Sequence, residues 1–177
     1  MEYMNIHPIF VHFPIALLTV YSVLEFVRFK KIIEKSWYLY VKGAFLIIGV
    51  LTSSLALQTG ELAQEAYRGS DTLNLIRIHS NWASAASSIF TLLAILYVIH
   101  FVVNSSLHEK IKSTFLKPLW EGVVFLSEIL FNSTWFVVLT ALVGLAAITI
   151  TGALGGAIVY GPDVDPVVKI IYSLLVK

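Results

Sequence analysis

The sequence contains no cysteine. This absence excludes disulfides, thiolate metal sites, cysteine-ligated iron–sulfur clusters and covalently attached c-type haem. Three catalytic motifs are absent as well: the G-x-S-x-G nucleophile turn, the H-E-x-x-H zinc motif and the phosphate-binding loop. These absences argue against a motif-defined hydrolase or nucleotide enzyme. We interpret the chain as one that is not an enzyme by itself, with a redox subunit as the alternative.

Charged residues are scarce, at 13% of the chain, whereas 58% of the 177 residues are hydrophobic and the mean hydropathy is +0.83. This composition is too apolar for a soluble domain and indicates an integral membrane protein. A helix needs about 20 apolar residues to cross a hydrocarbon core of about 30 Å. Four runs approach that length: Ile9–Val27, Tyr38–Leu57, Trp82–Val103 and Trp135–Tyr160. We predict an all-α membrane protein, with residues 1–177 forming one domain that is a four-transmembrane-helix bundle.

The first run has no basic region before it, so we expect a retained span and not a cleaved signal peptide. Basic residues are distributed unevenly over the connections. The first and third connections carry eight: Arg28, Lys30, Lys31, Lys35, Lys42, Lys110, Lys112 and Lys117. The second connection and the tail carry four: Arg68, Arg77, Lys169 and Lys177. The positive-inside rule places the eight in the cytoplasm and both termini outside. Because topology accounts for these charges, we predict no nucleic acid partner.

Two connections have features of their own. In the segment 115–131, apolar residues recur at helical spacing, which predicts an amphipathic helix in the cytoplasmic interface before the last span. These residues are Phe115, Leu119, Val123, Leu126 and Leu130. The connection Gly60–Asn81 is polar, and we expect it to include a short helix over the outer end of the bundle.

Histidines gather at the outer side of this topology. The stretch HPIFVHFP places His7 and His12 at the start of the first span, where its prolines are tolerated because the first helical turn has no internal hydrogen-bond partners. His79 opens the third span at a similar depth. His12 and His79 both continue into helix faces made largely of small residues, and we predict that they form a facing pair.

A facing imidazole pair suits the axial ligands of haem b, and this hypothesis makes the chain an electron-transfer protein. His7 and Tyr160 would then be supporting residues. The glycines of the last span, Gly152, Gly155 and Gly156, either make space for the ring or let a neighbouring helix pack closely, within one chain or between copies in a homo-oligomer.

Two alternatives use the same residues. In the first, His12 and His79 bind another transition-metal ion together with Glu61 or Glu65, because imidazole suits zinc, copper and iron; the chain would then bind or transport that ion. In the second, no cofactor is bound, the histidines cap helix ends, and the chain is an accessory or structural membrane subunit. The spacing of the residues does not choose between these alternatives.

Other ionisable residues lie at the inner side. We expect Glu25 to pair with Arg28, although an acidic residue in a membrane span can also relay protons. His100 and His108 have no evident partner in the sequence, and we interpret them as boundary residues.

The motifs HPIFVHFPIALL, TGELAQ and GALGGAIVYG, together with His79, resemble the bacterial four-helix membrane proteins catalogued as domain of unknown function 2231. The resemblance covers most of the chain and implies a multi-pass protein of the bacterial cytoplasmic membrane. That family has no established activity. Its loose grouping with transmembrane b-type cytochromes implies electron transfer, here to or from a separate redox protein or a quinone. The family's histidines match His7, His12 and His79.

Overall fold

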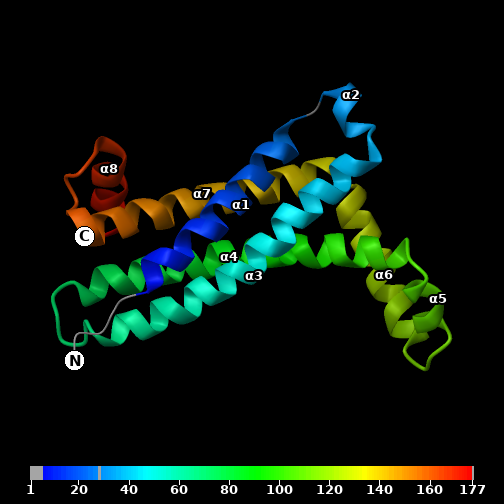
Figure 1. Ribbon diagram of the computed structural model, residues 1–177, viewed down its shortest axis with the longest axis horizontal. Coiled ribbons are helices and arrows are strands. Elements are labelled where there is room, and N and C mark those ends of the chain that lie inside the picture. The colour runs from blue at the N-terminus through cyan, green and yellow to red at the C-terminus, as the bar shows by residue number, and fades with distance from the viewer. Residues whose placement is uncertain (1–5, 28, 177) are drawn as a thin grey trace.

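The structure is a computed structural model that describes residues 6–27 and 29–176. Within these residues the chain forms helices and no strand, which confirms the all-α fold. Four of the described helices are long and apolar enough to cross a membrane: α1 (His7–Phe26), α3 (Ser36–Glu65), α4 (Leu73–Val103) and α7 (Thr134–Tyr160). They pack side by side, with α1 mainly against α3 and α4 mainly against α7 (Figure 1).

The shorter helices separate to the two ends of the bundle. They are α2 (Lys30–Ile33), α5 (Leu107–Lys112), α6 (Lys117–Asn132) and α8 (Pro166–Leu175). Figure 1 shows α2, α5 and α6 at one end, and α8, the α3–α4 turn and the start of α1 at the other.

Helices α3 and α4 extend well beyond their apolar runs. They contain 30 and 31 residues, so each is about 45 Å long at 1.5 Å per residue, against a hydrocarbon core of about 30 Å. Only residues 66–72 separate them. The expectation of a separate short helix over the outer end is therefore wrong, because a loss of hydropathy marks where the membrane ends and not where helical hydrogen bonding ends.

The core of the bundle is aromatic and aliphatic. Tyr21, Phe90 and Tyr97 are buried, and the ring of Tyr21 meets the other two edge-on, with centroid distances of 6.1 Å and 5.9 Å. Glycine allows the helices to approach around this core: a Cβ added at Gly144 of α7 would lie 2.6 Å from the Phe90 ring of α4. Shape complementarity between side chains and glycines drives helix association in a membrane, where water is absent.

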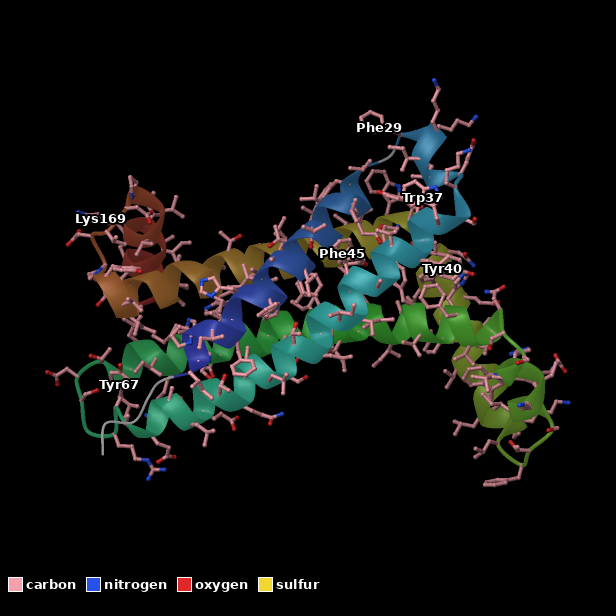
Figure 2. All side chains as sticks on the ribbon, viewed as in Figure 1. Phe29, Trp37, Tyr40, Phe45, Tyr67 and Lys169 are labelled. Carbon is pink, nitrogen blue, oxygen red and sulfur yellow. The ribbon has the colours of Figure 1, made fainter. Side chains whose placement is uncertain are left out.

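Aromatic side chains also mark both ends of the bundle. Figure 2 shows Phe29, Trp37 and Tyr40 together at the α2 end and Tyr67 at the α3–α4 turn, and all four are exposed. Tyrosine and tryptophan prefer the level of the lipid headgroups. These side chains therefore mark the two membrane interfaces. Their positions support the assignment of the helices between them as membrane-spanning.

Helix α6 occupies the position predicted for the amphipathic segment. Its exposed apolar residues include Leu119, Phe125 and Ile129, whereas Ser127 is buried. Lys117 lies 3.9 Å from Glu121 on its exposed surface. Phe115, predicted as part of this helix, precedes it and is exposed.

Helix α8 was not predicted, because Pro162 and Pro166 were interpreted only as the end of the last span. Asp165 caps its first turn by accepting hydrogen bonds from the backbone nitrogens of Val167 and Val168, at 2.8 Å and 3.0 Å. Val168 is buried against the first turn of α4 and the last turns of α7. The signal was present in the sequence: an Asp-Pro start followed by apolar residues at helical spacing, namely Val168, Ile171, Tyr172 and Leu175.

An ion pair joins α8 to the turn that precedes it. Lys169 donates a hydrogen bond to Asp163 at 2.8 Å, and this carboxylate raises the pKa of Lys169. Figure 2 shows Lys169 at α8.

Candidate functional site

His79 joins α4 to α7 at the end of the bundle that carries α8. Its Nδ1 lies 3.0 Å from the backbone oxygen of Thr151. Because a carbonyl can only accept, Nδ1 carries the proton and Nε2 is the nitrogen with a free lone pair. Gly155 lies under the ring, and a Cβ there would be 3.3 Å from Cε1 of His79. The glycine therefore lets the imidazole lie close to the α7 backbone.

His7 occupies a matching position between α1 and α3. Its Nδ1 lies 3.1 Å from the hydroxyl oxygen of Thr59. The Thr59 hydroxyl donates its proton to carbonyls of its own helix, so its oxygen accepts from Nδ1 of His7. A hydrogen bond to the Ala56 backbone further fixes the ring. Gly60 lies beside it, with a Cβ-to-Cε1 distance of 3.1 Å if alanine were present.

The two imidazoles are close enough to interact electrostatically. Four helices thus contribute to one site: α1 and α4 supply His7 and His79, and α3 and α7 each supply a hydrogen-bond acceptor and a glycine. Metal-bound histidines are typically oriented by a hydrogen bond from the second ring nitrogen to a carbonyl or another oxygen. Both imidazoles are held through Nδ1 in this way. This is the arrangement of a histidine that binds a metal through Nε2.

His12 lies elsewhere. It is exposed on α1, and its Nδ1 is 2.6 Å from the backbone oxygen of Pro8 in the same helix. Five residues separate His7 from His12, which places them about 140° apart around the helix. The structure therefore brings together His7 and His79, in place of the predicted pair of His12 and His79.

The other predicted site residues divide into two groups. Gly155 lies at the His79 ring. Gly156 packs on Val168 of α8, Gly152 has no atom within 4 Å of an added Cβ, and Tyr160 is 76% exposed at the end of α7. These three residues do not contact either imidazole.

The acidic residues predicted as further metal ligands do not join the site. Glu61 is exposed, and Glu65 pairs with Arg68 on the surface of α3. Across residues 6–27 and 29–176, no three histidine, aspartate or glutamate side chains are grouped so that they could hold a metal ion. Two imidazoles without a third protein ligand fit haem iron better than a small ion, because the porphyrin supplies the remaining ligands.

Two grooves on the bundle contain neither histidine. They lie between α3 and α4, and the larger of the two has a volume of about 360 Å³. Its polar lining consists of hydroxyl side chains of α4: Ser84, Ser87, Ser88 and Thr91. The hydroxyls of Ser88 and Thr91 donate to carbonyls of their own helix, and the Ser87 hydroxyl bonds that of Ser53 of α3 at 2.9 Å.

At the opposite end, three partners differ from those expected. Glu25 pairs with Lys42 at 2.9 Å, while Arg28 lies outside the described residues. His100 stacks on Phe131, with ring centroids 4.4 Å apart. His108 accepts a hydrogen bond from the indole nitrogen of Trp120 at 3.2 Å. Both histidines therefore have partners that sequence spacing alone did not reveal.

Comparison with known proteins identifies one family. A family model described as "Predicted membrane protein (DUF2231)" matches residues 3–166. No curated protein and no solved structure matches the chain.

Proposed function

The chain belongs to this family of predicted membrane proteins, and we propose that it binds haem b between His7 and His79 and carries electrons in the membrane. The observation that supports the proposal is the matched pair of imidazoles, each with Nδ1 held by an oxygen of a neighbouring helix. A bound haem would supply reversible one-electron transfer.

The chain's own residues would set the properties of that centre. Thr59 and the Thr151 carbonyl hold the two rings through Nδ1, which would orient both imidazoles toward the haem iron. Gly60 and Gly155 keep the ring edges clear of side chains. The partner in this proposal is a separate redox protein or a membrane quinone.

The test is a reduced-minus-oxidised visible spectrum of the detergent-purified chain produced with ample haem. We expect a Soret band and a reduced α-band in the wild type, and their loss in His7→Ala and His79→Ala. His12→Ala is the matched control, because it changes a histidine of α1 on another face, and it should retain the bands. Absorbance that is lost in His12→Ala and retained in His7→Ala would instead identify His12 as the ligand.

A colourless wild type would favour the accessory-subunit alternative, and a specific contact supports that reading. The hydrogen bond from His79 to Thr151 joins α4 to α7 whether or not a cofactor is bound. In that case His79→Ala should lower thermal stability without any spectral change, and metal analysis of the same sample would test for a bound ion.

We further propose that the end with α8 and the start of α1 faces outward across a bacterial cytoplasmic membrane, since the eight basic residues lie mostly at the other end. The natural chain has no cysteine, so single cysteines can report its orientation. In intact cells, a membrane-impermeant thiol reagent should label Ser70→Cys in the α3–α4 turn. Ser113→Cys, after α5, should react only once the membrane is opened. The reverse labelling pattern would invert the proposed topology.

A further inference from the structure

A carboxylate, an ammonium group and two phenols lie together inside the bundle, near the end that carries α2. Glu25 is 1% exposed. Its Oε2 lies 2.9 Å from Nζ of Lys42, and its Oε1 accepts a hydrogen bond from the Tyr97 hydroxyl at 2.5 Å. Along α1, this cluster is about 27 Å from His7 at 1.5 Å per residue. The two sites are therefore separate.

Such a cluster contributes little net stability. Desolvating a carboxylate and an ammonium group costs several kcal/mol for each ion, and well-packed apolar side chains often replace a buried ion pair without loss. Ionisable residues inside membrane bundles commonly belong to ion or proton pathways. The Glu25–Lys42 pair therefore calls for a chemical role.

Tyr21 supplies a second, independent observation. It is fully buried, and its hydroxyl interacts with both the Glu25 carboxylate and the Tyr97 hydroxyl. The ring of Tyr21 also meets that of Tyr97 edge-on. Two phenols thus lie beside one carboxylate, and Tyr97 donates the short hydrogen bond to it.

Lys42 connects the buried carboxylate to the surface of the bundle. Its side chain is 13% exposed, and Nζ lies 5.4 Å and 5.9 Å from the ring centroids of Tyr38 and Tyr97. Aromatic rings stabilise a cation at this distance. The ammonium group can therefore exchange protons with water at its outer edge while it remains bonded to Glu25.

The surroundings contain few other ionisable groups. On α4, His100 lies one turn after Tyr97; it stacks on Phe131 of α6 and interacts with Glu128 of that helix. The α7 residues in the surrounding core are apolar: Phe136, Val137, Ala141, Ala147 and Ile148. Glu25 is the carboxylate that Lys42 and the two phenols contact.

We propose that Glu25, Lys42, Tyr97 and Tyr21 form an internal proton-exchange site that opens toward the α2 end of the bundle. In the uptake step, the Lys42 ammonium transfers one proton across its hydrogen bond to Oε2 of Glu25. This leaves a neutral amine and a carboxylic acid. The amine then takes a proton from water at its exposed edge, so the cluster gains one proton and one positive charge. Release follows the same steps in reverse.

The experiment is infrared spectroscopy of the detergent-purified full chain as a function of pH. We expect a carboxylic-acid C=O band that appears reversibly on acidification and shifts in D₂O. The band should be absent in Glu25→Gln and retained in Glu121→Gln, a control on the exposed pair of α6. In Tyr97→Phe it should move to higher frequency, because the carboxyl group loses a hydrogen-bond donor.

Lys42→Arg separates proton transfer from simple ion pairing. Arginine keeps the positive charge but does not release a proton in proteins. We expect this variant to fold, with slower exchange of the Glu25 proton for deuterium. A Glu25 carboxylate that stays ionised at every pH where the chain keeps its helical circular dichroism would overturn the proposal. Unchanged exchange in Lys42→Arg would equally overturn the assigned role of Lys42. Neither result depends on haem binding.

Discussion

Replacing Lys42 by Met should lower the free energy of unfolding by about 3–5 kcal/mol, because it leaves the Glu25 carboxylate buried without its counter-ion. Glu25 is 1% exposed and receives a hydrogen bond from Tyr97, which alone does not offset the desolvation of a full negative charge. The double variant Lys42→Met/Glu25→Met should recover most of the loss, since it removes both charges and fills the space with apolar atoms of similar volume.

The measurement is unfolding of the purified protein in detergent, followed by circular dichroism. Lys117→Met is the matched control, because it breaks the pair between Lys117 and Glu121. Both of these side chains are more than half exposed. That change should cost no more than about 1 kcal/mol, as is usual for surface pairs. Equal losses in Lys42→Met and Lys117→Met would mean that the Glu25 pair is solvated and not buried.

Replacing Gly144 by Ala should destabilise the contact between α4 and α7. The added Cβ would lie 2.6–3.1 Å from three ring atoms of Phe90, closer than carbon atoms can approach. Phe90 is fully buried against Tyr21, so its ring has little room to move. Overpacking of this kind costs about 1–3 kcal/mol.

Gly152→Ala provides a control in the same helix, because a Cβ at this position meets no atom within 4 Å. We expect it to be neutral or slightly stabilising, since alanine is the better helix former. Phe90→Leu should rescue Gly144→Ala by shortening the opposing side chain. If Gly144→Ala and Gly152→Ala unfold at the same temperature or at the same concentration of denaturing detergent, the close contact between Phe90 and Gly144 does not hold α4 against α7.

Several features followed from the sequence alone, because they depend on the total hydropathy or charge of a segment and not on which residues meet. Four apolar runs, a low charge content and an asymmetry of basic residues are sufficient to predict an all-α membrane protein with four spans, and the motifs near both ends indicated the family. The depth of His7, His12 and His79 followed in the same way, since a residue's position along a helix sets its height in the membrane.

Which of these residues meet was decided by the tertiary structure. Depth does not specify direction around a helix, and each residue changes that direction by about 100°. His7 and His12 lie on the same helix, yet it is His7 that interacts with His79, because the rotation of α1 depends on how the helices pack. The same packing places Lys42 at Glu25 and Gly155 under His79, while Gly152 stays at the surface. Hydropathy therefore determined the spans of this protein, and the fit of side chains such as Phe90 against Gly144 decided which polar groups face one another between them.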